Sequence, residues 1–212
     1  MFTNYLDDLE ERFASLAPLR PSLAAAADLL ALAFDAGSKL LVCGNGGSAA
    51  DSEHIVGELM KGFVKRRPLA EESQDMLSEV DPELGEVLSA GLQEALPAIA
   101  LTGHMSLHTA VSNDSGGDLP FAQQVWGYGN PGDVLWAIST SGNSRSVLLA
   151  AVAAKAKGMS VLAMTGCGGG RLAELADVCI RAPSSETYRA QEEHMAIYHM
   201  LCLAIEQRFF AE

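Results

Sequence analysis

The sequence has little positive charge. Its 14 lysine and arginine residues stand against 27 aspartate and glutamate residues, which gives a formal net charge of −13 at pH 7. A general nucleic-acid binder needs a basic face to displace counterions from phosphates, so the composition argues against that class. One short basic cluster, Lys61 to Arg67, is typical of a solvated helix end, where the helix dipole stabilises cations.

Cysteine is also scarce, and the four that occur lack CxxC spacing. Cys43, Cys167, Cys179 and Cys202 lie in apolar or glycine-rich stretches, which predicts reduced thiols in a cytoplasmic protein. The N-terminus is acidic and lacks the basic-then-apolar pattern of a signal peptide. No apolar run reaches the roughly 18 residues of a membrane span, because Asp28 interrupts the alanine-rich segment before it is long enough. We therefore expect no membrane partner.

The composition that remains is that of an ordered globular protein. Hydrophobic residues make up 49% of the 212 residues and charged residues 19%, so the chain can bury a core without disulfides or metal. This length predicts one domain over residues 1–212.

Short apolar runs alternate with helical patterns along this domain. Strands are expected at 39–43, 98–102, 133–138, 160–164 and 178–181. Helices are expected at 2–36, split in two by Pro18 and Pro21 and stopped at Gly37, then after the first strand, at 144–157, near 171–175 and at 187–209. This alternation predicts an α/β fold, a three-layer αβα sandwich around a five-stranded, mainly parallel sheet.

Residues 69–96 interrupt the alternation. The stretch is acidic and predicts an excursion with one or two helices. A solvent-facing decoration is the first interpretation, and a lid or a subunit contact are the alternatives.

Two polar loops follow strands, where ligands bind in open α/β sheets. Ser139-Thr-Ser-Gly-Asn-Ser144 places four hydroxyls at a helix start, and a helix cap would use only one of them. No lysine follows as in a nucleotide-binding P-loop, so a sugar phosphate suits the loop better. The other loop, Gly44 to Ser48, begins a formal dinucleotide fingerprint, but the stretch where an acidic residue should hold the ribose is basic.

Ionisable side chains on two helices add candidate chemistry. His54 and Glu58 are four residues apart and share a helix face, which by itself favours a structural hydrogen bond. On the last helix, Gln191 and His199 lie about 80° apart, whereas His194 lies roughly 140° from His199. We therefore expect His194 to be a capped or surface imidazole outside any site.

The motifs together resemble the sugar isomerase (SIS) domain family, and within it the phosphoheptose isomerase family. The resemblance rests on NGGSAADSEH at 45–54, STSGNS at 139–144 and RAQEEHMAIYH at 189–199, and it extends over nearly the whole chain. It implies an αβα fold and an aldose–ketose isomerase that converts sedoheptulose 7-phosphate to D-glycero-D-manno-heptose 7-phosphate through an enediol. It also implies a homotetramer, a dimer of dimers, with active sites between subunits.

The resemblance also implies a set of site residues. Glu58 is the expected base and His199 its partner acid, and His54, Glu58, Gln191 and His199 are the expected ligands of one zinc ion per subunit. The substrate contacts implied are Asn45, Gly46, Gly47, Ser48, Glu58, Asn113, Asp114, Ser139, Thr140, Ser141, Ser144 and Gln191. Without the resemblance, the Asn-Asp pair would be interpreted as a simple turn.

Two features of this set of zinc ligands are difficult to reconcile with one another. Eight helical residues rise about 12 Å, which is near the limit for Gln191 and His199 to ligate one ion. Either Gln191 precedes the regular helix or different subunits contribute. Glu58 is expected to be both base and zinc ligand, and a carboxylate that ligates zinc is a weaker base. Exchange of this ligand during turnover would let Glu58 fill both roles.

The excursion at 69–96 departs from the family pattern, in which the preceding segment runs within a few residues into the next strand. Isomerisation of a different sugar phosphate is therefore one alternative. A second is a non-catalytic SIS adaptor that binds a replication initiator protein, although the presence of Glu58 and His199 favours an enzyme. A third, a phosphosugar-sensing regulator, is disfavoured because the acidic N-terminal helices are too few for a DNA-binding domain.

Overall fold

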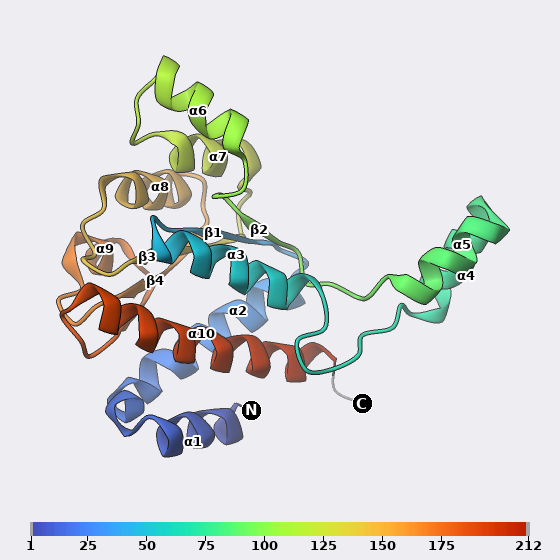
Figure 1. Ribbon diagram of the computed structural model, residues 1–212, viewed down its shortest axis with the longest axis horizontal. Coiled ribbons are helices and arrows are strands. Elements are labelled where there is room, and N and C mark those ends of the chain that lie inside the picture. Colours follow the sequence, from blue (N-terminus) through green and yellow to red (C-terminus); the bar gives the residue numbers. More distant parts are fainter. Residues whose placement is uncertain (1, 211–212) are drawn as a thin grey trace.

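The sheet at the centre of the fold contains five strands that all run parallel. The computed structural model describes residues 2–210 and orders the strands β2-β1-β3-β4-β5 (Figure 1). Their bounds are Leu40–Cys43 (β1), Ala98–Ala100 (β2), Val134–Ser139 (β3), Ser160–Thr165 (β4) and Val178–Arg181 (β5). The five predicted strands and the αβα class are confirmed, and the sheet is wholly rather than mainly parallel.

Helices cover both faces of the sheet (Figure 1). Along β3, Val134, Trp136 and Ile138 point into one core and Leu135 and Ala137 into the other, as the two-residue period of a strand requires. One layer contains α1 (Thr3–Arg12), α2 (Arg20–Asp35), α3 (Gly47–Met60) and α10 (Thr187–Phe209). The other contains α7 (Pro120–Tyr128), α8 (Arg145–Ala156) and α9 (Gly170–Leu175), with α6 (Met105–Asp114) beside α7.

The N-terminal segment forms two helices, but not divided where expected. The chain leaves α1 at Phe13, and a 3-10 turn at Ala14–Leu19 contains Pro18. Pro21 stands in the first turn of α2, where its missing N–H removes no helical hydrogen bond. The break predicted at the two prolines was therefore misplaced, whereas the stop at Gly37, which has φ +72°, is confirmed.

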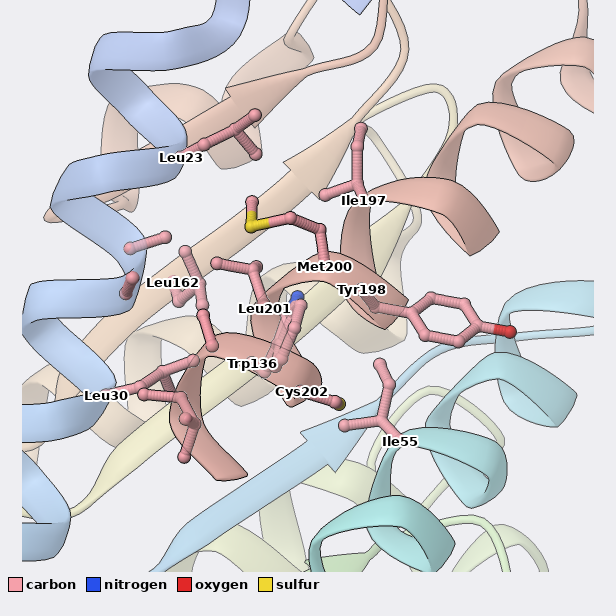
Figure 2. Close-up of a cluster of buried hydrophobic side chains, with 14 of the residues drawn as sticks. Leu23, Leu30, Ile55, Trp136, Leu162, Ile197, Tyr198, Met200, Leu201 and Cys202 are labelled. Atoms are coloured by element: carbon pink, nitrogen blue, oxygen red, sulfur yellow. The ribbon is translucent and has the colours of Figure 1, made fainter. Parts of the chain in front are cut away.

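The helical run Ala14–Asp35 is 22 residues long and, by length and composition alone, apolar enough to cross a membrane. This finding differs from the expectation that no run reaches that length. Leu23 and Leu30 of α2 are buried against residues of α10 and β3 (Figure 2). Burial in the core accounts for part of the apolar character of this run, since 39% of its most apolar window is buried.

Two helices that the sequence did not predict, α6 and α7, lie between β2 and β3. None of the residues of α6 is buried. Without a buried face the segment carries no periodic apolar stripe, which is the signal that predicts a helix.

Residues 71–91 form a helical hairpin, which we call the arm. It contains α4 (Glu71–Val80) and α5 (Pro82–Gly91), stands away from the layered body (Figure 1), and confirms the prediction of one or two helices. The helices pack closely at Gly85, where an added Cβ would lie 2.6 Å from the Leu77 carbonyl oxygen. A bridge between Pro68 and Gln93 closes the base of the arm.

A buried ion pair fastens the segment before the arm to α10. Arg67 and Glu206 are both fully buried, and Arg67 Nη2 lies 2.8 Å from Glu206 Oε1. The amides of Phe63 and Val64 also donate to Glu206, at 2.7 and 3.0 Å. Burial by itself raises the pKa of Glu206, but these amides and the Arg67 guanidinium outweigh it and hold the pKa below its ordinary value.

Candidate active site

The loops after β1 and β3 meet directly. Asn45 Nδ2 donates to Ser144 Oγ at 2.8 Å and to Ser146 Oγ at 3.0 Å. The strand order changes direction between β1 and β3, so helices α3 and α8 start at this edge from opposite layers. Two helix N-termini with surrounding hydroxyls form a site for an anion.

A pocket of about 370 Å³ lies where these loops meet. It is lined by Asn45, Gly46, Gly47, Ser48, Ile138, Ser139, Thr140, Ser141, Ser144, Thr187 and Gln191. A larger hollow of about 910 Å³ between α1 and α10 lies away from the strand ends. Thr187 was not among the predicted site residues, although it is a hydroxyl at a helix start, the same signal that singled out the Ser139–Ser144 loop.

Gln191 belongs to this pocket and to the regular part of α10. Its amide lies against Gly47, where an added Cβ would come within 2.4 Å of Gln191 Nε2. Because α10 begins at Thr187, the alternative in which Gln191 precedes the helix is wrong. Gln191 and His199 are therefore about 12 Å apart along one helix.

Asn113 and Asp114 do not line the pocket within a single chain. They are exposed in the last turn of α6, and Asn113 Nδ2 donates to Asp114 Oδ1 at 2.8 Å. The interpretation of this pair as a simple turn is wrong, because its backbone is helical.

A second group of polar side chains lies further along α3. His54 Nε2 is 3.0 Å from Glu58 Oε1, and His54 Nδ1 is 3.0 Å from the hydroxyl of Tyr198. A carboxylate only accepts, so His54 donates from Nε2 to Glu58, and the Tyr198 hydroxyl at Nδ1 fixes the orientation of the ring. Figure 2 shows the Tyr198 ring leaving the apolar cluster of α10 toward α3. No sequence pattern singles out this tyrosine, which stands beside His199 among core residues.

His199 completes this group. Its ring lies 5.0 Å from that of His54 and 5.5 Å from that of Phe63, centroid to centroid. His199 Nε2 is buried and has no hydrogen-bond partner among the residues described. Burial and the neighbouring His54 lower the pKa of His199, which favours the neutral imidazole.

His194 is not the capped or surface imidazole that we predicted. It is fully buried, and its Nε2 lies 3.1 Å from the Thr165 carbonyl oxygen. Its position outside the His54–Glu58 group agrees with the predicted angle of roughly 140° from His199 around the helix. Its burial comes from the sheet on which α10 packs.

Part of the expected zinc ligand set fits a metal ion. Two donors about 2 Å from a tetrahedral zinc lie roughly 3.3 Å apart, close to the separation of His54 Nε2 and Glu58 Oε1. His199 adds a buried nitrogen without a partner in the described chain. Within residues 2–210, no three His, Cys, Asp or Glu side chains converge tightly enough to hold a metal.

The chain matches a known family model, described as the SIS domain, over residues 4–91 and 78–166. The two matched ranges together cover most of the chain and overlap inside the arm.

Individual relatives are phosphoheptose isomerases. The phosphoheptose isomerase of Rhodospirillum rubrum is 42% identical, with 92% of this chain and 89% of that protein covered. Solved structures of phosphoheptose isomerases from Neisseria gonorrhoeae and Francisella tularensis both superpose with a TM-score of 0.74, at 33% and 32% identity. Each comparison covers 97% of this chain and 96% of the other.

Proposed function

Since the chain belongs to the SIS domain family, and within it to the phosphoheptose isomerases, we propose that it interconverts sedoheptulose 7-phosphate and D-glycero-D-manno-heptose 7-phosphate. The observation that supports this proposal is the meeting of the two hydroxyl-rich loops around one pocket, on a chain that also groups a carboxylate and imidazoles further along α3 and α10.

The pocket binds the phosphate end of the sugar. The hydroxyls of Ser139, Thr140 and Ser141 donate to phosphate oxygens, and the starts of α3 and α8 add backbone N–H groups and positive dipole ends. Asn45 holds the two loops together through Ser144, so the donors are in place before the substrate arrives.

Isomerisation moves one proton between neighbouring carbons. Glu58 removes the proton beside the carbonyl, and His199 as a neutral imidazole donates a hydrogen to the carbonyl oxygen, which gives the enediol. Glu58 then returns its proton to the adjacent carbon, while the hydroxyl on the first carbon gives its proton to His199, which forms the new carbonyl and restores both groups. His54 Nε2 lies 3.0 Å from Glu58 Oε1 and Lys61 Nζ lies 3.4 Å from Glu58 Oε2, so both carboxylate oxygens have a polar neighbour.

We further propose that His54, Glu58, Gln191 and His199 hold zinc, which supplies polarisation of the carbonyl when it is bound. Because Gln191 and His199 are two helical turns apart, one subunit provides Gln191 and its neighbour provides His199. Active sites between subunits require an oligomer, which we propose to be a homotetramer. The same arrangement brings Asn113 and Asp114 to sugar hydroxyls across a subunit boundary. The four free cysteines support a place in the cytoplasm.

The proposed activity is tested by a coupled isomerase assay on sedoheptulose 7-phosphate, run with and without a chelator. We expect turnover that a strong chelator reduces at least tenfold and that added zinc restores. Metal analysis of the untreated protein should find close to one zinc per subunit. Turnover unaffected by complete metal removal would refute the zinc proposal, and no turnover together with tight binding of a protein partner would favour the adaptor alternative.

Tyr198 provides a second test, because its hydroxyl fixes the orientation of His54. Replacing Tyr198 with Phe keeps the buried ring and removes this hydrogen bond. We expect isomerase turnover to fall about 10- to 100-fold, the usual effect of losing a group that orients a ligand. Tyr188→Phe, at an exposed tyrosine on the same helix, is the control. Equal activities of the two variants would show that the Tyr198 hydroxyl has no role.

A further inference from the structure

The arm carries a row of apolar side chains that nothing in its own chain covers. Met76 and Val80 of α4 and Leu84 and Val87 of α5 are exposed, Val80 to 87%. Among the residues of the two helices only Gly85 is buried. The spacing of 76 and 80, and of 84 and 87, puts these side chains on one face of each helix.

Two helices as short as those of the arm are at most marginally stable in water by themselves. Each helix contains 10 residues, and isolated helices shorter than about 12–15 residues are marginal in water. The sequence nonetheless specifies them, with Pro82 at the start of α5 and the Asp81 side chain accepting from the Leu84 amide at 2.9 Å. The exposed apolar face therefore requires a partner surface.

Charge is distributed unevenly along the arm and its base. Residues 71–91 contain seven carboxylates and no lysine or arginine. The segment at the base contains Lys61 and Arg66, which are exposed, and Lys65, which is half-buried and donates to the Phe210 carbonyl oxygen at 3.2 Å. The arm is thus acidic along its length, with Glu79, Asp81 and Glu83 at its tip, which we define as Glu79–Leu84, and the segment 61–66 at its base is basic.

The base also contains a hollow of about 580 Å³, which we call the base hollow. Its lining comes from both sides of the arm base and includes Phe63, Val64, Lys65, Arg66 and Leu92. Lys65 and Arg66 lie among apolar side chains there, which suits a segment that is both acidic and apolar.

We propose that two copies of this chain exchange arms. The arms lie antiparallel, their apolar faces pack together, and the acidic tip of each seats in the basic base hollow of the other. A two-fold axis passes through the middle of the paired arms. It places the tip of each copy in the base hollow of the other, so the same contact forms twice. This inference names an interface that the proposed function does not require, and it holds whichever sugar phosphate the enzyme accepts.

The occupant of the base hollow cannot be the tip of the same arm. Each helix of the arm rises about 15 Å, which separates tip and base within one chain. The arm also stands away from the body (Figure 1), and its apolar face is exposed among residues 2–210. An unrelated basic protein would cover the acidic tip but would leave the base hollow of this chain empty.

Charge exchange between two variants tests the proposal. The base variant carries Lys65→Glu and Arg66→Glu, and the tip variant carries Glu79→Lys and Glu83→Lys. Each alone places like charges opposite each other in both contacts, so we expect its self-association to weaken at least tenfold. Mixed together, the two variants have opposite charges in both contacts, and we expect mixed pairs to outnumber self-pairs in native mass spectrometry.

A control variant, Asp28→Lys with Glu174→Lys, changes the net charge as the tip variant does at two exposed sites away from the arm. It should associate like the wild type. Thermal unfolding of each variant separates lost pairing from lost folding, and isomerase activity is recorded separately from mass. Wild-type association by both arm variants, or mixing without preference for mixed pairs, would overturn the proposal.

Cross-linking supplies a second measurement on the unaltered chain. A zero-length carbodiimide reagent should join Glu79 or Glu83 to Lys65, in a mixture of ¹⁴N- and ¹⁵N-labelled protein. We expect cross-linked peptides that combine both labels, as links between two copies require. Links confined to a single label would mean that the arm folds back as a lid on its own chain, and the exchange would be wrong.

Discussion

Replacing Glu58 with Gln is expected to lower isomerase turnover by about a thousandfold or more, since proton transfer by a positioned group contributes 10²- to 10⁴-fold. The amide has the same shape but cannot accept the proton from carbon. Its oxygen can still accept from His54 Nε2, which is 3.0 Å from Glu58 Oε1, so the fold at this point should persist. Turnover is measured with sedoheptulose 7-phosphate, and binding of the sugar phosphate is measured by calorimetry.

The matched control is Glu53→Gln on the same helix. Glu53 is exposed and accepts from Thr102 Oγ1 at 3.0 Å, away from His54 and His199. We expect this variant to retain most of the turnover. The phosphate end of the substrate meets the hydroxyl loops and not Glu58, so Glu58→Gln should still bind it. Undiminished turnover by Glu58→Gln would remove this residue from the role of base and leave the chemistry to another group.

Much of the fold could be predicted because its signals are local. Each strand is a short apolar run buried on both faces, as in Leu40–Cys43, and a glycine or hydroxyl cluster ends it. Parallel strands end at one edge, so the loops after β1 and β3 had to come close, and the Asn45–Ser144 hydrogen bond confirms that they do.

Other features depend on contacts that no local pattern encodes. The burial of His194 comes from β4, 29 residues away, whose Thr165 carbonyl it meets. Tyr198 resembles the apolar neighbours on its helix, and only the position of α3 reveals what its hydroxyl does. The helix α6 buries none of its residues within the chain, so its sequence carries no stripe to recognise.

The candidate site also combines features that one sequence segment predicts with others that only the folded structure shows. The sequence could identify the hydroxyl loops and the spacing of His54 and Glu58, because each lies within one segment. The relation of Gln191 to His199 could not be decided from spacing, since it depended on where α10 begins. The start of that helix at Thr187 excludes one alternative and leaves the arrangement between subunits.

Replacing Glu206 with Gln is expected to destabilise the fold by about 3–5 kcal/mol, the usual result of removing one partner from a buried ion pair. The change leaves the fully buried Arg67 guanidinium without its carboxylate and weakens the acceptor of the Phe63 and Val64 amides. For a chain of this size the melting temperature should fall by about 10 °C. Thermal and urea unfolding at pH 7 measure the loss.

The control is Arg208→Gln, which breaks an ion pair at the surface of the same helix. Arg208 Nη2 lies 3.0 Å from Asp35 Oδ2, with both side chains partly exposed, so the loss should stay below about 1 kcal/mol. A similar loss in both variants would mean that the buried pair contributes no more than an exposed one.

Acid should reduce the difference between the wild type and Glu206→Gln. The pKa of Glu206 is lower in the folded chain than its ordinary value of 4.5, so its stabilising effect is fully present above about pH 4.5. It is lost as the pH falls through the folded pKa, because the carboxylate then takes up a proton as it already has in the unfolded chain. The variant has no such proton to gain, so the two unfolding free energies should converge in acid. A gap that stays constant from pH 7 to well below pH 4 would show that packing, and not the charge of Glu206, fastens the base of the arm to α10.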